Sequence, residues 1–475
     1  MASNSDSRTL GLSRRGTGGS RIGLETVFLV LAVLLIDVIT MGAVTRYGAA
    51  MLFGPLLVLG LAFAAFRLLD NPVDVLSWFL VIIVNLDFFR IQGTRLTADI
   101  LTSSMLLYAL LVRFGLAGTM AIRGRVEKVY LFYVLATFIC VVLSVDKAAS
   151  LKNWGRDLEY LVLFIFLSTL ALSERDRLKI AVAAVISSVI PCLLGLAGMA
   201  FGIDAFYGLI TPVAGGPWVK RITGTISHPV VFSLYLAFVA TITLALMILE
   251  KRLRKGLLPV FLLQLTVLYL TYGRTGWIQL LIGVTALFWI MGRRKVVFTV
   301  IPVVVTGIMF SIPTLLARMQ NAFDLSKESD NSFVWRIGLW IYALKKFPQK
   351  PIFGSGQDTF INYVGYGTQA RNVRHAGGTG YASHHTWIGL LIETGLVGLV
   401  TFAVLMITVN RALSLRRRDP TGRRDPIVIG LSAAFLSLIV SSFAADPFNL
   451  PVISVYFWVL LALALKPSTL PGVRA

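Results

Sequence analysis

The sequence predicts an all-α, polytopic integral membrane protein with about 14 transmembrane helices and one long external loop. Of its 475 residues, 56% are hydrophobic and only 14% are charged, which is more apolar surface than a soluble core could bury. Apolar stretches of about 20 residues, the length of a transmembrane helix, recur along the chain. Most Lys and Arg residues cluster in short segments between these stretches, as the positive-inside rule requires. The net charge of +21 therefore indicates membrane topology and not nucleic-acid binding.

The expected helices follow in order from the apolar stretches. Residues 1–22 are rich in Ser, Gly and Arg, and we expect a disordered cytoplasmic tail. The first apolar stretch has no small-residue cleavage site after it, so we interpret it as a retained span. Spans 1–11 fill residues 23–313, spans 12–14 fill residues 386–465, and residues 466–475 form a second tail. The expected limits are 23–44, 48–69, 73–89, 97–117, 129–145, 158–173, 179–201, 229–249, 257–272, 276–292, 296–313, 386–410, 427–444 and 451–465.

The distribution of positive charge places both termini in the cytoplasm. The basic segments that share this side are 14–21, 123–128, 175–179, 251–255, 293–295 and 416–424. Against the trend, Arg90, Arg95, Lys147, Lys152 and Arg156 fall outside, near the least certain spans. Segments 219–228, 273–276 and 314–385 then all lie on the opposite face, which is periplasmic in a bacterial-type cell.

The loop 314–385 is the only substantial segment expected outside the membrane, and loops this long are usually functional or internally ordered. Within it, Ser332–Phe347 has the period of an amphipathic helix that ends before Pro348. Its expected apolar stripe comprises Phe333, Ile337, Trp340, Ile341 and Leu344, with Arg336 off the stripe.

Arg274 is the sharpest candidate for chemistry because an arginine between two spans is costly unless it is paired, snorkelled or used. Gly273 and Gly276 flank it and are expected to let a ligand approach the backbone. The guanidinium group binds phosphate in a bidentate manner. Snorkelling to the membrane surface is the structural alternative.

Lys220 and Arg221 place two more positive charges on the external side, against the usual bias, which suggests an anionic ligand. A solvated loop or contact with lipid headgroups would explain them as well. His228 precedes Pro229, and we interpret it primarily as the cap of the next helix.

His384 and His385 open the twelfth expected span. A neutral imidazole there could accept a proton from a hydroxyl group, although packing beside Trp387 would also account for these histidines. Glu393 lies deeper in the same span, where an intramembrane carboxylate is either functional or part of an ion pair.

Several kinds of chemistry have no motif in this chain. The sequence lacks a P-loop and a nucleophile elbow, and it has no soluble domain to bind a nucleotide. Adjacent histidines do not face together on a helix, so we expect no metal site and no cofactor. The two cysteines, Cys140 and Cys192, lie in apolar stretches and indicate neither a disulfide nor a metal. An activated donor is therefore expected to arrive through the membrane.

At these residues the chain resembles the superfamily of O-antigen ligases and Wzy-type polysaccharide polymerases. The resemblance covers roughly residues 180–400. It rests on His384 with Gly395 and Gly398 downstream, on Arg274-Thr275-Gly276, on Arg221 ahead of a Ser-His-Pro, and on Trp335-Arg336 followed by Pro351–Gly356. His385 departs from the family pattern, which prefers Asn, Ser or Gln at that position, and the glycine spacing selects His384.

The resemblance implies a GT-C-like fold and a metal-independent, inverting glycosyl transfer from an undecaprenyl-diphosphate-linked oligosaccharide. By carry-over, Arg221 and Arg274 hold the diphosphate, and His384 orients or deprotonates the acceptor hydroxyl. Lys220, His228, Arg336 and His385 are secondary candidates for substrate binding.

The favoured hypothesis is a polymerase of O-antigen or exopolysaccharide repeat units at the periplasmic face of the inner membrane. The first alternative is a ligase that transfers the glycan to lipid A-core, and a protein O-glycosyltransferase is a third enzyme of this kind. A transporter of lipid-linked glycans is the alternative from another class, although no internal repeat supports it. A flippase and a chain-length regulator are compatible partners, together with membrane lipids; a nucleic acid is not.

Overall fold

The computed structural model describes residues 71–86, 122–203, 209–212, 218–226, 228–303, 305–306, 332–364, 383–417 and 424–466. These residues are mostly helical, as the sequence predicts. Within these ranges, four helical segments are long and apolar enough to cross a membrane: Glu174–Phe201, Pro229–Leu249, Lys251–Leu270 and Gly395–Arg417. Expected spans 23–44, 48–69 and 97–117 lie outside the described residues, so the total of about 14 stays a prediction.

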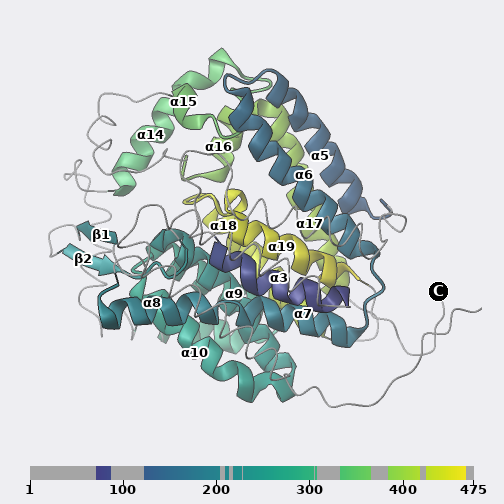
Figure 1. The fold of residues 1–475 in the computed structure, drawn as a ribbon, viewed down its shortest axis with the longest axis vertical. Helices are drawn as coiled ribbons and strands as arrows, with labels where there is room; N and C mark the ends of the chain where they lie inside the picture. The colour runs from purple at the N-terminus through teal and green to yellow at the C-terminus, as the bar shows by residue number, and fades with distance from the viewer. Residues whose placement is uncertain are drawn as a thin grey trace, which may run out of the picture. The chain divides into compact units, whose positions relative to one another are not determined.

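Figure 1 shows the order of the helices and the one described hairpin. The longer helices are α3 (Pro72–Leu86), α5 (Arg125–Val142), α6 (Lys147–Thr169), α7 (Glu174–Ile186), α8 (Val189–Phe201), α9 (Pro229–Leu249), α10 (Arg254–Leu270), α11 (Arg274–Ile290), α14 (Ser332–Lys346), α16 (Thr386–Glu393), α17 (Gly395–Arg417), α18 (Pro426–Ser441) and α19 (Pro451–Leu465). The short elements are β1 (Leu209–Pro212), β2 (Trp218–Arg221), η3 (Lys251–Leu253), η4 (Val296–Val300), η5 (Phe347–Gln349), α15 (Phe360–Val364) and η7 (Pro447–Asn449). Strands β1 and β2 pair antiparallel, with Ile210 opposite Lys220.

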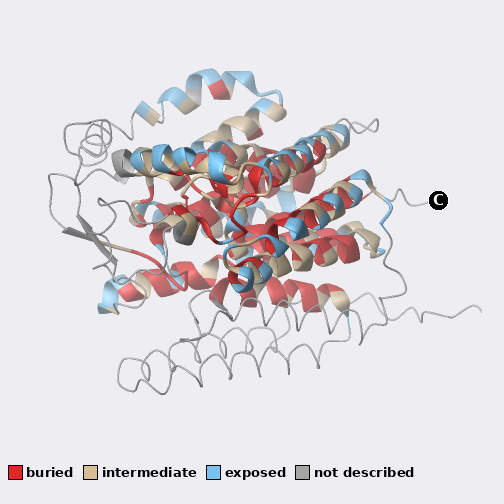
Figure 2. Ribbon diagram, turned by 90° about the horizontal axis from the view of Figure 1, so that it is seen from above, coloured by how far each residue is buried: buried red, intermediate tan, exposed pale blue. Residues whose placement is uncertain are grey.

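Helices α9, α11 and α18 form one tightly packed part of the bundle. Their common core contains Ala245, Leu287, Met291, Ile429 and Ala433, all nearly inaccessible. Figure 2 shows buried residues, in red, concentrated in the inner helices of the bundle. Helix α9 is apolar around its whole circumference and is buried along most of its length. A helix of this composition is typical of the centre of a membrane bundle.

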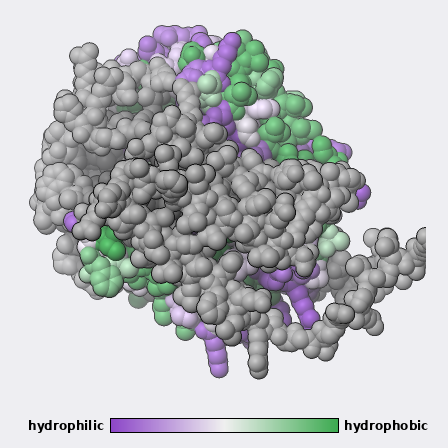
Figure 3. Space-filling view, viewed as in Figure 1, coloured by the Kyte–Doolittle hydropathy of each residue, from purple (hydrophilic) through white to green (hydrophobic). Residues whose placement is uncertain are grey.

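Helices α5, α6, α17 and α19 pack together in another part of the bundle. Tyr130 of α5 stacks on Trp458 of α19, with ring centroids 4.1 Å apart. The outward side of α5 remains apolar and exposed: Phe132 is 61% and Leu135 58% accessible. Figure 3 shows hydrophobic side chains gathered over this helix. A large exposed apolar face of this kind marks contact with lipid or protein.

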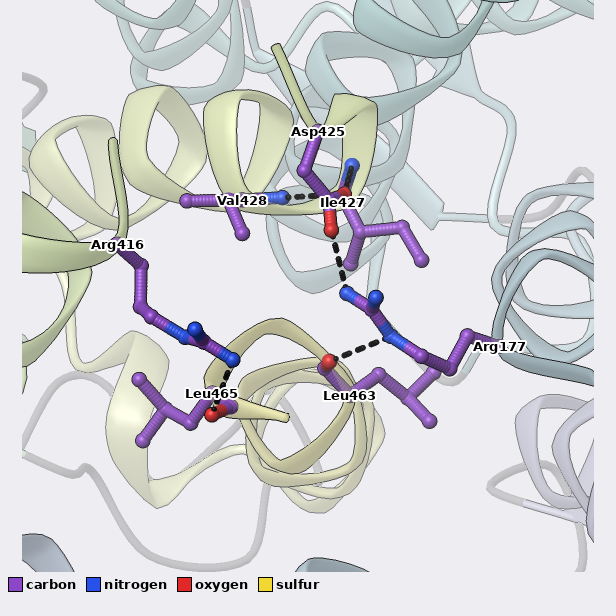
Figure 4. Close-up of polar contacts among 7 residues, drawn as sticks. All are labelled: Arg177, Arg416, Asp425, Ile427, Val428, Leu463 and Leu465. Atoms are coloured by element: carbon purple, nitrogen blue, oxygen red, sulfur yellow. Dashed lines mark hydrogen bonds and ion pairs between the residues drawn. The ribbon is translucent and has the colours of Figure 1, made fainter. Parts of the chain in front are cut away.

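A polar cluster ties together segments that the charge pattern places on the cytoplasmic side (Figure 4). The Arg177 guanidinium donates from Nε to the Leu463 carbonyl at 2.9 Å and forms a 2.5 Å ion pair with Asp425. Arg416 donates to the Leu465 carbonyl at 2.8 Å. These bonds satisfy carbonyls at the end of α19 that the helix itself leaves without partners. Segments predicted to share one side of the membrane therefore do lie together.

The expected span 386–410 is wrong as a single helix. The structure breaks it at Thr394 into α16 and α17, and Gly395 adopts a left-handed φ of 63°. Glu393 and Thr394 interrupt the apolar run at the break, but the mean hydropathy of the whole run still predicts a single span.

Backbone hydrogen bonds from the segment Pro351–Gly356 stabilise this break. Ser355 and Gly356 donate their N–H groups to the carbonyls of Ile392 and Glu393, at 3.0 and 2.8 Å. In return, the Pro351 and Ile352 carbonyls accept from the N–H groups of Leu396 and Val397, at 2.9 and 3.1 Å. Interrupted helices are tolerated at membrane depth only when such partners satisfy the backbone.

The amphipathic helix predicted over Ser332–Phe347 is confirmed as α14, and its expected apolar stripe is only partly buried. Ile341 and Leu344 are 51% and 44% exposed, whereas Ala343 is fully buried. Arg336, expected to lie off the stripe, instead donates to the Ala444 carbonyl at 2.9 Å. Helix α14 therefore packs on its neighbours through the face that carries Arg336.

Candidate functional site

The turn before α11 holds Arg274 against α9. A Cβ atom on Gly273 would lie 2.3 Å from Ser233 Oγ, and one on Gly276 would lie 2.5 Å from Ser233 Cβ. We expected these glycines to admit a ligand, and the structure corrects this interpretation: they admit Ser233 of α9. Arg274 thus begins a helix that is fixed by close packing. The preceding Tyr272 has a left-handed φ of 51°, an uncommon conformation for a large side chain.

Arg221 is brought to the same turn from the end of β2. Its Nε atom donates to the Thr271 carbonyl at 2.7 Å, which satisfies a carbonyl at the end of α10. Lys220, the preceding residue of β2, is half-buried. The structure therefore places Arg221 beside the turn that carries Arg274.

His384 occupies a strained turn that is held from both sides. Its φ is 51°, a left-handed conformation that costs a residue other than glycine about 1–2 kcal/mol. Trp340 Nε1 donates to the Ser383 carbonyl at 2.8 Å, and the Thr386 N–H donates to the Ser442 carbonyl at 3.0 Å. Strain that the surroundings impose in this way is common at functional sites.

His385 has a structural role in the same turn. Its Nδ1 accepts from the Ile388 N–H at 3.3 Å and so caps α16. Its ring lies edge-on to Trp340, with centroids 4.9 Å apart, and to Phe443 at 5.7 Å. His385 is thus engaged in capping and packing, and the neighbouring His384 is the better candidate for chemistry.

Arg274, Arg336, His228 and His384 form a chain of groups that influence one another electrostatically. Burial lowers the pKa of Arg336, and the positive charge of Arg274 lowers it further. Burial, with the charges of Arg336 and His228, lowers the pKa of His384 to about 3. His384 is therefore neutral at physiological pH. It lies within electrostatic reach of Arg336, which lies within reach of Arg274, and guanidinium groups of this kind can bind an anion.

Two remaining candidates have capping roles. His228 caps α9, because its Nδ1 accepts from the Val230 N–H at 3.2 Å, as the sequence indicated. Glu393 accepts from the Phe360 N–H at 3.0 Å and so holds the start of α15. The structure thus gives Glu393 a backbone partner, which the ion-pair interpretation had not anticipated.

Sequence reasoning missed the acidic groups behind the histidine turn. Thr386 Oγ1 donates to Asp446 Oδ1 at 2.8 Å, and Gln357 Nε2 donates to Asp157 Oδ2 at 2.9 Å. The signal for Asp157 was a carboxylate within the helical stretch that becomes α6. Asp446 and Gln357 lie in connecting segments that carry no motif.

The described residues define a helical membrane protein in which Arg274 at the start of α11, Arg336 of α14 and the neutral His384 before α16 are linked electrostatically. Residues 259–403 match the family model described as O-Antigen ligase. This stretch includes Arg274, Arg336 and His384, whereas Arg221 and Asp446 lie outside it. This match covers part of the chain and supports the resemblance that the motifs indicated.

Together with the long apolar helices, this match points to a membrane protein. A search of the curated proteins gave no match.

Proposed function

We propose that this protein polymerises polyprenyl-diphosphate-linked oligosaccharide repeat units at the periplasmic face of a bacterial inner membrane. The observation that carries the proposal is the electrostatic proximity of Arg274, Arg336 and His384. Together they offer a cationic site for a diphosphate and a neutral base for a hydroxyl group. The apolar helical body gives the polyprenyl chain a place beside that site.

The reaction follows from these charges. Arg274, Arg336 and Arg221 bind the diphosphate of the donor, and the acceptor hydroxyl donates a hydrogen bond to His384. The hydroxyl oxygen attacks the anomeric carbon, the bond from that carbon to the phosphate oxygen breaks, and the configuration inverts. The electron pair leaves with the diphosphate, where the guanidinium groups stabilise the added charge. The proton passes to His384.

Donor binding also makes His384 a stronger base. Its pKa is low partly because Arg336 is positively charged, and a bound diphosphate offsets that charge. The histidine thus becomes able to accept a proton once the donor is in place. Because diphosphate is already a good leaving group, the proposed reaction needs no metal, and turnover in the presence of EDTA tests this point.

A ligase that transfers the glycan to lipid A-core or another acceptor is the second candidate. The description of the matching family model as O-Antigen ligase favours it. Both enzymes would use the same donor and the same arginines, and they differ in the acceptor.

The test gives the purified protein one substrate, the cognate polyprenyl-diphosphate oligosaccharide, and resolves the products by size. A ladder of multiples identifies a polymerase, because donor and acceptor are then the same molecule. Product that forms only after addition of lipid A-core or a protein identifies a transferase of the ligase kind. If folded protein yields no product under either condition, glycosyl transfer is refuted and transport becomes the better hypothesis.

A further inference from the structure

A second polar site lies behind the histidine turn, in a cavity of about 60 Å³ bordered by α5, α6, α16, α17 and α19. The cavity reaches Thr386, two residues from His384. Three half-buried carboxylates, those of Asp157, Glu393 and Asp446, contribute to its wall. The proposed donor site uses none of them.

Gln357 shows what kind of group the cavity would accept. Its side chain lines the cavity, and the residue is only 3% exposed. Its Nε2 atom is bonded to Asp157, but its Oε1 atom is buried and has no hydrogen-bond partner within the described part of the chain. A buried acceptor without a partner is costly. A ligand that donates hydrogen bonds would give this oxygen a partner and could also bind the three neighbouring carboxyl groups.

The wall favours a sugar over a metal ion. Among the described residues, no three acidic, histidine or cysteine side chains are grouped so as to hold a metal, so the carboxylates are spread around the cavity. Tyr130, Phe402 and Trp458 add aromatic surface to the lining, as suits the apolar faces of a sugar ring. The volume corresponds to roughly four to six water-sized groups, which is comparable to the hydroxyl groups along one edge of a sugar.

We propose that this cavity binds the terminal sugar of the acceptor glycan through its hydroxyl groups. The inference rests on the proposed glycosyl transfer and adds the place of the second substrate. The two substrates differ in what they need: the anionic diphosphate is attracted by Arg274 and Arg336, whereas the described residues that line the cavity include no lysine or arginine. A neutral sugar needs hydrogen-bond partners for its hydroxyl groups, and the cavity supplies them. His384 is electrostatically coupled to Arg336 of the donor site and lies two residues from Thr386 of the cavity, so it is placed to act as the base for an acceptor hydroxyl.

The test titrates full-length protein in nanodiscs with two probes, followed by ligand-observed NMR. One probe is the repeat-unit oligosaccharide freed of lipid and diphosphate, and the other is inorganic diphosphate. Gln357→Leu should weaken oligosaccharide binding about tenfold, as expected for one lost hydrogen bond, and leave diphosphate binding unchanged. Arg274→Lys should do the reverse. Asp157→Asn, which keeps the side-chain volume, should also weaken the oligosaccharide alone.

Gln279→Leu is the matched control. Gln279 is fully buried, donates from Nε2 to the Leu234 carbonyl at 3.1 Å, and likewise has a buried Oε1 without a partner in the described residues. It does not line this cavity, so its substitution should change neither binding constant.

Each outcome decides the inference. Oligosaccharide binding that is absent in the wild type, equal in wild type and Gln357→Leu, or equally weakened in both Leu variants would overturn it. If both binding patterns hold but no glycosidic product forms, the proposed reaction fails and the cavity assignment stands. If a ladder forms and Gln357→Leu binds the sugar normally, the cavity assignment fails and the proposed reaction stands.

Discussion

Substitution of Gly395 by alanine should unfold the junction between α16 and α17. Gly395 has a φ of 63°, and a Cβ atom there would lie 2.3 Å from the Ile352 carbonyl oxygen. The left-handed conformation costs a residue with a side chain about 1–2 kcal/mol. Relief of the clash would also move Pro351–Gly356 away from the break. Loss of the two bonds that Leu396 and Val397 donate adds about 1 kcal/mol each. We therefore expect a destabilisation of about 3 kcal/mol.

Thermal unfolding of the purified protein in detergent measures this effect, with an expected fall in Tm of about 3 °C. Gly256→Ala is the matched control, because a Cβ atom at Gly256 of α10 would meet nothing within 4 Å. Its Tm should stay unchanged or rise slightly, since alanine favours a helix. Equal Tm values for the two variants would show that Pro351–Gly356 does not hold the break.

The remaining predictions concern the candidate site. Arg274→Lys should lower the turnover of lipid-linked substrate by about 100-fold or more, because lysine cannot bind phosphate in a bidentate manner. The variant should still insert and fold. Near-normal turnover would show that Arg274 has no part in the mechanism. His384→Ala should lower activity by about 100-fold or more with little change in Tm. His385→Ala should instead lower the stability of the fold by about 1 kcal/mol, because the cap of α16 disappears. The opposite pattern would mean that the roles of the two histidines are exchanged. Because burial and neighbouring charge lower the pKa of His384 to about 3, the wild-type enzyme should keep this group neutral on acidification to about pH 5. Arg336→Gln removes one of those charges and raises the pKa, so the activity of this variant should begin to fall at a higher pH than that of the wild type; coincident pH–rate profiles would contradict the electrostatic coupling.

Local signals predicted individual helices well. The expected span 229–249 matches α9, because His228 and Pro229 mark its start and an unbroken apolar run fills its length. The turn at Gly273 likewise marks the start of α11. Hydropathy and capping residues contain this information without reference to the rest of the chain.

Features that depend on distant partners could not be predicted from local sequence. The break at Thr394 depends on hydrogen bonds from Pro351–Gly356, some 40 residues earlier. The face of α14 that meets the bundle is decided by Arg336 and its bond to Ala444, 108 positions away. A helical period shows which residues share a face, but it does not show which face finds a partner.

In the candidate site, too, local sequence predicted some residues and could not predict those that depend on distant partners. Motif spacing selected Arg221, Arg274 and His384, and the structure places Arg221 beside the Arg274 turn and His384 within electrostatic reach of Arg336. Asp446 and Gln357 belong to no motif, so their position on the wall of a cavity became visible only when helices far apart in sequence were assembled.

The amino ends of α9, α11 and α16 contribute positive potential that does not depend on side chains. Residues at or beside these starts, namely His228, Arg274 and His384, belong to one electrostatic cluster that also includes Arg336. Aligned peptide dipoles give the amino end of each helix about half a positive charge. The backbone itself thus adds cationic potential where the diphosphate is expected, and no substitution of an arginine removes it. Such variants should hold the donor weakly yet detectably, so that retention of the lipid-linked substrate and its conversion can be studied separately.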